Sequence, residues 1–369
     1  MALGFPRFEI KAFNKSFLTE GPKMISAQYI GEQHVAVDSY EAREPLNDEV
    51  QIRVFYAGLC GTDLHIVHGN MDKRVAKNLT FGHEMSGVIE KVGSEVLNLK
   101  AGDPVTVMPL DWDGTCPACV AGYQHICHNL NFVGIDSPGA LQTLWNVKSS
   151  WVFKLPSSLS LRDAALVEPL AVAVHDVKRA DLSANDKVLI VGGGPIGLLV
   201  GLVGKHFGAD VRIVELDDSR VELITALGFE AFSPLDTDIA EMVNEWTGGK
   251  GADAIFEVSG AASAVLTAVN HLKVRGKLII VAIHAQPREI NLQRVFWREL
   301  TIIGVRVYES SDFETAIELL AQGVIPTSKI ITHIVPIRNI EAAIATLEQG
   351  LAMKVLIDVQ NESSEVSSL

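Results

Sequence analysis

The chain has 369 residues, of which 48% are hydrophobic and 21% are charged, and its net charge at pH 7 is −14. This length favours two folded domains over one, and the composition is that of a globular protein. The acidic balance argues against non-specific nucleic-acid binding, which needs a basic surface, so no nucleic-acid partner is expected.

Neither a membrane span nor a secretion signal is expected. The longest apolar run, around residues 188–204, is interrupted by glycines, which makes it a poor bilayer-spanning helix. Residues 1–23 lack the continuous apolar core of a signal peptide. We interpret them as an N-terminal extension.

Short strands separated by turns are predicted from residue 24 to about residue 146. Residues 49–54, 87–93 and 103–107 show a strand pattern with a period of two, which is typical of half-buried strands. We expect this half to form a largely antiparallel β assembly, with metal-binding side chains on its loops.

Two glycine-rich motifs bring metal-binding residue types close together in this half. Segment 58–65 (GLCGTDLH) contains Cys60, and segment 81–87 (FGHEMSG), about twenty residues later, contains His83 and Glu84. A thiolate, an imidazole and a carboxylate suit a zinc ion held by three protein groups with a fourth position open. Glu168 is a further candidate ligand, distant in sequence.

The second half begins with a dinucleotide-binding pattern. An apolar strand is predicted at 186–191, a glycine-rich run follows at 192–197, and a helical run continues beyond it. In this context a Gly-x-Gly-x-x-Gly motif lets backbone N–H groups and a helix N-terminus approach a pyrophosphate. The predicted cofactor contacts in this run are Gly192, Gly194, Pro195, Ile196 and Gly197.

Glu215 ends the next predicted strand, 210–214, eighteen residues after Gly197. Its carboxylate can accept hydrogen bonds from the adenosine ribose and would repel a 2′-phosphate, which favours NAD over NADP. Arg220 weakens this preference for NAD, because a nearby cation could bind the 2′-phosphate of NADP. Alternatively, the Arg220 side chain lies along the adenine or faces solvent.

Strands at 252–258, 276–281 and 300–305 continue the alternation with helices, which predicts a parallel sheet covered on both faces. Val258 and Ile283 lie at or beyond the ends of two of these strands. Because cofactors bind at strand C-terminal ends, we expect both residues to contact the cofactor.

Together these motifs resemble the zinc-dependent medium-chain dehydrogenase/reductase family. The likeness runs from about residue 24 to residue 359, and residues 168–175 (EPLAVAVH) resemble its polyol (sorbitol and butanediol) dehydrogenase branch. The resemblance implies an α/β fold: a largely β, GroES-like catalytic domain at 24–180 and a doubly wound Rossmann domain at 181–307. Residues 308–369 would then return to the catalytic domain, with helices at 313–320 and 340–348 and a strand at 354–357.

The resemblance also implies a second, structural zinc ion in a lobe that carries four cysteines in the family. Three of these positions hold cysteines here, and the fourth is an aspartate: Asp113, Cys116, Cys119 and Cys127. His125 or His128 could take the place of the aspartate, and a metal-free lobe is the alternative. All four cysteines of the chain are thereby assigned to metal sites, so a reducing cytoplasm is the expected location.

The chemistry implied by the family assigns further roles. A zinc ion acidifies a bound alcohol, and the nicotinamide accepts its hydride. Glu84 either ligates the zinc or lies behind it, Asp63 orients the imidazole, and Thr62 hydrogen-bonds the substrate oxygen. His65 passes the proton to solvent, and His175 is structural. Three aromatic residues are expected to wall the pocket: Phe81, Trp112 and Trp145.

The expected reaction is therefore NAD-dependent oxidation of a secondary alcohol of a polyol or sugar-like substrate to a ketone. By family habit, the enzyme would be a homodimer or homotetramer. The nearest alternative is the same chemistry on an inosose, a sugar acid or L-threonine. Two others are a non-catalytic NAD-binding protein and a zinc-free quinone or enone reductase.

Overall fold

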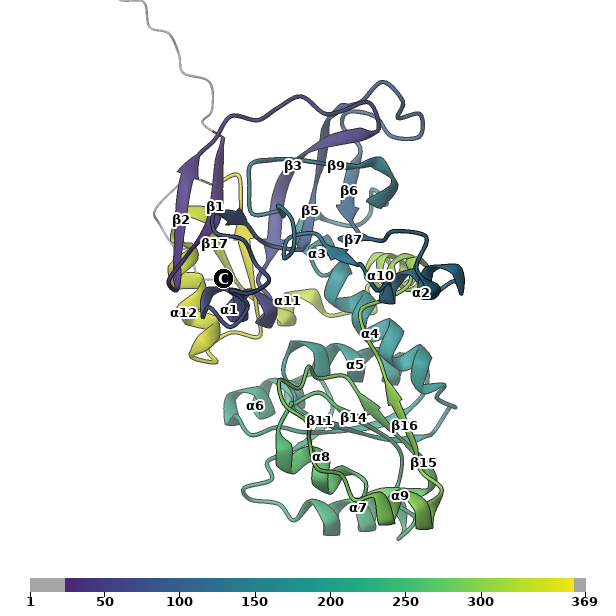
Figure 1. Ribbon diagram of the computed structural model, residues 1–369. Coiled ribbons are helices and arrows are strands. Elements are labelled where there is room, and N and C mark those ends of the chain that lie inside the picture. Colours follow the sequence, from purple (N-terminus) through teal and green to yellow (C-terminus); the bar gives the residue numbers. More distant parts are fainter. Residues whose placement is uncertain (1–23, 362–369) are drawn as a thin grey trace, which may run out of the picture.

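Two large β-sheets organise residues 24–361, the part of the chain that the computed structural model describes (Figure 1). The first is mostly antiparallel, with the strand order β10-β6-β5-β3-β18-β17 and with β9 also paired to β3. Its strands are β3 (Glu49–Gly58), β5 (Glu84–Val92), β6 (Pro104–Val107), β9 (Leu144–Lys148), β10 (Val152–Lys154), β17 (Ile331–Pro336) and β18 (Lys354–Asp358). The predicted antiparallel β assembly is thus present.

Two smaller sheets complete this part of the molecule. One has the order β2-β1-β4 and the other pairs β7 with β8. Their strands are β1 (Ile25–Gly31), β2 (His34–Ser39), β4 (Leu79–Thr80), β7 (Leu110–Asp111) and β8 (Asn131–Phe132).

The last strand of the chain returns to the first sheet, beside β3. The two strands are antiparallel, with Leu356 opposite Gly58, and the Leu59 N–H donates to the Val355 carbonyl over 3.0 Å. This register places Lys354, the first residue of β18, level with the residues that follow β3. A residue near the C-terminus thereby reaches the segment that contains Cys60.

The second large sheet is parallel throughout, with the order β13-β12-β11-β14-β15-β16. Its strands are β11 (Lys187–Val191), β12 (Asp210–Val214), β13 (Glu230–Phe232), β14 (Ala252–Glu257), β15 (Leu272–Ile280) and β16 (Thr301–Gly304). The helices between them are α5 (Pro195–His206), α6 (Asp218–Ala226), α7 (Ile239–Thr247), α8 (Ala262–Ala268) and α9 (Leu292–Arg298). The predicted fold class, a Rossmann sheet beside a largely β unit, is confirmed.

Helices α4 (Val167–Ala180) and α10 (Ser310–Ala321) pack against each other between the two large sheets, and α4 also packs on α5 (Figure 1). The predicted helices at 313–320 and 340–348 correspond to α10 and α12. The remaining helices are α1 (Gly61–Val67), α2 (Pro117–Val120), α3 (Leu161–Ala164), α11 (Thr327–Ile330), α12 (Ile340–Glu348) and the 3-10 turns η1 (Gln124–Ile126), η2 (Ser149–Trp151) and η3 (Ile337–Asn339).

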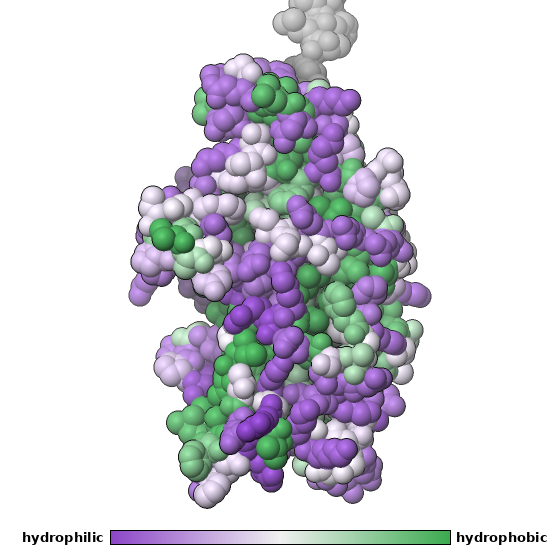
Figure 2. Space-filling model, turned by 90° about the vertical axis from the view of Figure 1, so that its right-hand side faces the viewer, coloured by the Kyte–Doolittle hydropathy of each residue, from purple (hydrophilic) through white to green (hydrophobic). Residues whose placement is uncertain are grey.

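Among residues 24–361, no helix is long and apolar enough to cross a bilayer. The proposed N-terminal extension, residues 1–23, lies outside the described residues. Hydrophobic side chains reach the lower part of the surface shown in Figure 2. Exposed apolar residues on α9 include Leu292, Phe296 and Trp297.

Candidate active site and metal sites

The first metal site predicted from the sequence is assembled where β3, α1 and β5 meet. Cys60 immediately precedes α1, His83 and Glu84 lie at the start of β5, and Gly58 is opposite Glu84 in the β3–β5 pair. One potential ligand atom from each of Cys60, His83 and Glu84 lies within 4.8 Å of the other two. His83 and Glu84 are buried and Cys60 is half-buried. This donor set, with one side partly open, fits a catalytic zinc ion.

A buried lysine that the sequence analysis did not identify completes this site. The Lys354 ammonium forms an ion pair with Glu84 Oε2. The carboxylate reaches it across Gly58, where an added Cβ would lie only 1.9 Å from Glu84 Oε2. Glycine at position 58 is therefore required for the pair. The sequence does show a lysine at the start of an apolar strand. It does not show that this lysine is buried or which side chain it faces.

The site is short of positive charge, which is the condition that a bound cation relieves. Burial would lower the pKa of His83, but the negative charges of Asp63 and Cys60 outweigh it and raise that pKa to about 10. Burial raises the pKa of Asp63 as well. The raised pKa of His83, despite its burial, indicates that negative charge outweighs positive charge around the ring. The residues present thus fit a divalent cation.

Glu168, the fourth candidate ligand, lies near this cluster but has a different partner. The Tyr308 hydroxyl donates to Glu168 Oε1 over 2.8 Å, and both side chains are buried. Burial, opposed by the charge of His83, raises the pKa of Glu168 to about 7. Glu168 is absent from the group of Cys60, His83 and Glu84 whose ligand atoms lie within 4.8 Å. Tyr308 is a second site residue that the sequence analysis missed.

The other predicted catalytic side chains lie on α1. The buried Asp63 accepts a hydrogen bond from the Cys60 N–H over 2.8 Å, and its other oxygen lies 3.6 Å from His83 Nδ1. Asp63 Oδ1 therefore faces His83 Nδ1 but lies beyond hydrogen-bond distance from it, so its orienting role stays a prediction. Thr62 is half-buried, and His65 is exposed.

The second predicted metal site is a compact lobe around α2. Asp113, Cys116, Cys119 and Cys127 place one ligand atom each within 4.8 Å of the others. Neither His125 nor His128 belongs to this group: the His125 ring packs on His175 with a centroid distance of 5.0 Å.

The thiols of this lobe are close together and already receive hydrogen bonds. The Sγ atoms of Cys116 and Cys127 are 3.7 Å apart, and the His128 N–H donates to Cys116 Sγ over 3.4 Å. Burial and the neighbouring thiols raise the pKa of Cys119 to about 12. Thiols that cannot all ionise on their own suit a structural zinc ion, which binds them as thiolates.

The glycine-rich turn after β11 leaves room for a phosphate group. Gly197 packs so closely that an added Cβ would lie 1.9 Å from the Gly192 carbonyl oxygen. At Gly194, the residue before α5, an added Cβ would meet only Arg220 Nη1, at 3.9 Å. Pro195 and Ile196 follow as the first residues of α5. An open helix N-terminus behind a tight glycine turn fits a dinucleotide pyrophosphate.

Glu215 is held next to this turn. Its Oε2 accepts the Gly193 N–H over 2.7 Å, and its Oε1 accepts the Leu216 and Asp217 N–H groups. Arg220 lies in the first turn of α6, the helix that follows Glu215. Val258 follows β14 and is half-buried, whereas Ile283 is 88% exposed. Three of the predicted cofactor contacts thus lie at the C-terminal ends of the parallel strands: the glycine turn, Glu215 and Val258.

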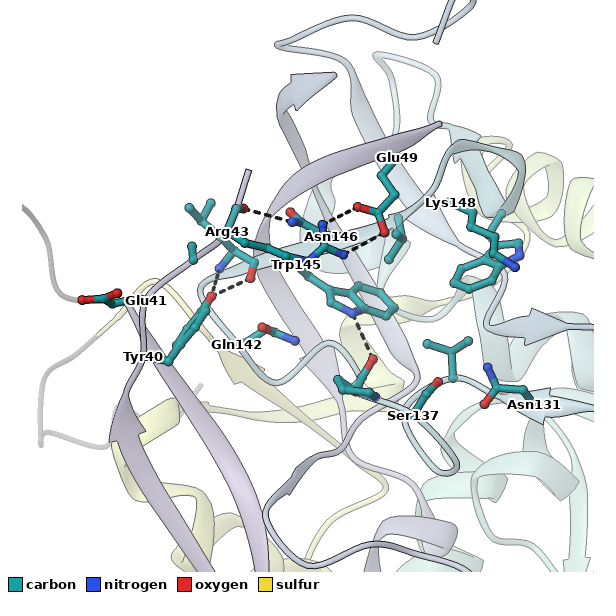
Figure 3. A pocket seen from close by; sticks show the side chains of 16 residues that line it. Tyr40, Glu41, Arg43, Glu49, Asn131, Ser137, Gln142, Trp145, Asn146 and Lys148 are labelled. Atoms are coloured by element: carbon teal, nitrogen blue, oxygen red, sulfur yellow. Dashed lines mark hydrogen bonds and ion pairs between the residues drawn. The ribbon is translucent and has the colours of Figure 1, made fainter. Parts of the chain in front are cut away.

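His175 has the structural role expected of it, because its Nδ1 lies 2.7 Å from Asp312 Oδ2, between α4 and α10. The expectation that the three aromatic residues wall the substrate pocket stays a prediction. Phe81 is fully buried in the core. Trp145 faces a different cavity, of about 430 Å³, where its indole N–H donates to the Pro138 carbonyl over 3.1 Å (Figure 3).

The cavity in Figure 3 contains none of the four candidate ligands of the first metal site. Trp112 lines a second cavity, of about 320 Å³, together with Tyr308, the partner of Glu168. Trp112 thus shares a cavity with a residue of the candidate active site.

Comparison with known proteins decides the family. Residues 46–157 match the alcohol dehydrogenase GroES-like domain, and residues 195–322 match the zinc-binding dehydrogenase domain. The chain is 47% identical to 2-dehydro-3-deoxy-L-galactonate 5-dehydrogenase of Pseudoalteromonas atlantica, over 92% of this chain and 100% of that protein. This chain belongs to the zinc-binding dehydrogenases.

Other relatives of the dehydrogenase agree. It is 32% identical to sorbitol dehydrogenase of Halalkalibacterium halodurans, over 89% of this chain and 96% of that protein. The crystal structure of 2R,3R-butanediol dehydrogenase from Bacillus subtilis superposes with a TM-score of 0.84 at 30% identity, over 91% of this chain and 99% of that one. The predicted resemblance and the prediction of an oxidoreductase are both confirmed.

Proposed function

We propose that this dehydrogenase oxidises a secondary alcohol of a sugar acid or related polyol to a ketone, with NAD as the hydride acceptor and one catalytic zinc ion. The grouping of Cys60, His83 and Glu84 carries the proposal. The relatives named for a galactonate derivative, sorbitol and a butanediol support the substrate class. The most similar of these acts on a sugar acid, which we therefore place ahead of an inosose or L-threonine.

The chemistry divides between the bound groups and the protein. Zinc would supply Lewis-acid polarisation of the alcohol oxygen, and NAD would accept the hydride. Cys60, His83 and Glu84 would hold the metal, while the ion pair with Lys354 holds the Glu84 carboxylate in place. The protein thus presents an anionic pocket with one built-in cation.

Proton removal is assigned to α1. The Thr62 hydroxyl would accept the proton of the substrate alcohol as it passes its own proton on toward the His65 imidazole, and the imidazolium would release a proton to solvent. Two observations support this route. Thr62 and His65 lie on the same helix directly after Cys60, and Thr62 is half-buried whereas His65 is exposed to solvent. Glu168, whose carboxylate is held by Tyr308, would be the alternative carboxylate ligand of the metal.

The choice of NAD rests on Glu215. Its carboxylate lies beside the glycine turn and accepts three backbone hydrogen bonds, which fix its position where an adenosine ribose would lie. A second zinc ion in the lobe of Asp113, Cys116, Cys119 and Cys127 would have a structural role.

We also propose that two or four copies assemble through the edge of the parallel sheet. β16 ends this sheet, and exposed Phe296 and Trp297 lie on the adjacent α9. An unpaired edge strand beside exposed apolar side chains is typical of an interaction surface. A second copy of the chain would bury both. Light scattering should give a dimer or tetramer, and Trp297→Glu should lower the mass; a monomeric wild type would contradict this.

Two further assignments, the cellular compartment and the domain division, are proposed on smaller grounds. Four free cysteines, each within a candidate metal site, favour a reducing cytoplasm. The pairing of β18 with β3 supports a catalytic domain built from 24–180 and 308–369 around a cofactor domain at 181–307.

The reaction itself is tested with substrates matched in length. Six-carbon aldonates and the corresponding hexitols would be incubated with the purified enzyme and either NAD or NADP, and reduced cofactor would be followed by absorbance. We expect NAD reduction, faster with at least one aldonate than with its hexitol. Absence of cofactor reduction with every compound would refute the proposed function.

A further inference from the structure

Arg306 is a cationic side chain for which the described residues supply no hydrogen bond or ion pair. It is exposed and follows β16 by two residues. The Val305 N–H donates to the Ile280 carbonyl over 3.2 Å, so the preceding residue still belongs to the edge of the parallel sheet. Two residues later, Tyr308 reaches Glu168. Arg306 thus lies between the cofactor edge and the candidate metal site.

The chain here runs from the lower part of the molecule toward α10, at the junction of the two large sheets (Figure 1). Val307 has a φ of 49°, a left-handed conformation that is rare for a β-branched residue. A single residue in this conformation turns the backbone between Arg306 and Tyr308. Such strain persists where the surrounding structure fixes the position of the neighbouring side chains.

The loop after β8 packs against His83 and carries Asp136, whose carboxylate is within reach of the charge of Arg306. The Phe132 ring packs edge-on against the His83 ring, with centroids 5.4 Å apart. An added Cβ at Gly134 would lie 3.2 Å from the His83 Cβ. Asp136, in the same loop, accepts the Phe132 N–H over 2.9 Å. The loop is therefore fixed to the side of His83.

Two arginines act on Asp136, and only one of them is paired with it. Burial opposes ionisation, but hydrogen bonds and the positive charges of Arg74 and Arg306 lower the pKa of Asp136. Arg74 holds both carboxylate oxygens, with nitrogen–oxygen distances of 2.6 Å. Because Asp136 is already occupied, Arg306 retains donors and a positive charge beside the loop.

The charges of the site dictate where an anionic substrate can place its carboxylate. Asp63, Glu84 and Glu168 surround the metal-binding atoms, so a carboxylate would be repelled there. Arg306 offers the nearby unpaired cation, and a guanidinium binds a carboxylate through two parallel hydrogen bonds. The hydroxyl to be oxidised and the carboxylate would then occupy opposite ends of the site.

We propose that Arg306 binds the carboxylate of a sugar-acid substrate and so selects sugar acids over neutral polyols. This inference rests on the proposed function, of which it specifies the substrate class.

The test compares Arg306→Gln and Arg306→Lys with wild type on a six-carbon aldonate and its hexitol. The ratio of kcat/KM for the aldonate to kcat/KM for the hexitol should fall about 10- to 100-fold in Arg306→Gln, mainly through KM, as expected for losing hydrogen bonds to a charged group. Arg306→Lys should recover part of the ratio, because it restores the charge without the second donor.

Lys250→Gln is the matched control. Lys250 is exposed and lies just before β14, at the N-terminal ends of the strands of the same sheet, whereas Arg306 follows the C-terminal end of β16. Its replacement by glutamine changes the net charge by the same amount as Arg306→Gln. The ratio should be unchanged in this variant. An equal fall in Lys250→Gln and Arg306→Gln, or no fall in Arg306→Gln, would overturn the proposal.

A binding measurement separates this proposal from the proposed function. With NADH present, the aldonate should raise the melting temperature of wild type and of Lys250→Gln, but not that of Arg306→Gln. If wild type reduces NAD with neither substrate, the proposed function fails. If it reduces NAD but Arg306→Gln keeps both the ratio and the thermal shift, only the role of Arg306 fails.

Discussion

Lys354 and Glu84 form a buried ion pair beside the candidate catalytic metal, with side-chain exposures of 4% and 1%. The pair joins the last strand of the catalytic sheet to the motif that carries His83. Removing one member of a buried pair leaves an uncompensated charge, which costs more than the pair itself contributes.

Lys354→Met should therefore lower the free energy of unfolding by about 3 kcal/mol. The double variant Lys354→Met, Glu84→Gln removes the orphaned charge and should recover most of that loss. Urea unfolding of the wild type, both single variants and the double variant measures this coupling. Additive effects of the two substitutions would show that the side chains do not depend on each other.

The second metal site should hold zinc independently of catalysis. Cys116→Ser should reduce bound zinc from two ions per chain to one and lower the melting temperature, because closed structural sites stabilise the fold around them. Turnover per folded molecule should change little. Metal analysis of purified protein measures the zinc content.

His128→Ala is the control for that site, since His128 lies in the lobe but outside the ligand group. It should retain two zinc ions. Loss of zinc in His128→Ala would contradict the assignment of Asp113 as the fourth ligand. One zinc ion per chain in both wild type and Cys116→Ser would contradict the second zinc site itself.

Cofactor choice should respond to Glu215. Glu215→Gln removes the charge that would repel a 2′-phosphate, while Arg220 remains close to the turn. The ratio of kcat/KM for NADP to kcat/KM for NAD should rise about 10- to 100-fold, in the range of one or two hydrogen bonds to a charged group. Glu222→Gln, an exposed change on the same helix α6, should leave the ratio as in wild type.

Asp176 makes the stability of the enzyme depend on pH. It is buried in α4 and neither carboxylate oxygen has a hydrogen-bond partner among the described residues. Burial, with repulsion from Asp312, raises the pKa of Asp176 well above its usual value. The folded protein then binds this proton more tightly than the unfolded chain, so stability is lost as pH rises from about 4 toward the folded-state pKa.

Asp176→Asn cannot ionise and should escape that loss. Relative to wild type, its free energy of unfolding should be higher at pH 8 than at pH 5, by about 1–3 kcal/mol, the cost of a buried polar group without a partner. Urea unfolding at both pH values gives the comparison. A stability difference between the two proteins that is the same at pH 5 and pH 8 would rule out this role.

The sequence predicts the parts of the site that depend on short spacing. Cys60, His83 and Glu84 lie in two glycine-rich motifs, so their clustering follows from tight turns at the ends of β3 and β5. The strand–glycine–helix order around Gly192 likewise predicts the cofactor turn. The parallel sheet follows from the regular alternation of strands and helices.

The partners of these residues could not be predicted, because they come from distant strands. Lys354 reaches Glu84 only through the register of β18 on β3, and Tyr308 reaches Glu168 only after the chain leaves β16. Neither residue type distinguishes a site partner from an ordinary strand end or core aromatic. The cavity that Trp145 lines could not be predicted for the same reason, since a tryptophan on a strand does not reveal which cavity it faces.

The most direct test of the account is zinc dependence of the reaction. Protein treated with a strong chelator, then freed of it, would be assayed for NAD reduction with an aldonate, before and after addition of zinc, beside Cys60→Ser. The account predicts no NAD reduction without zinc, recovery on zinc addition in wild type, and none in Cys60→Ser. Full NAD reduction by protein that metal analysis shows to be free of zinc would contradict it.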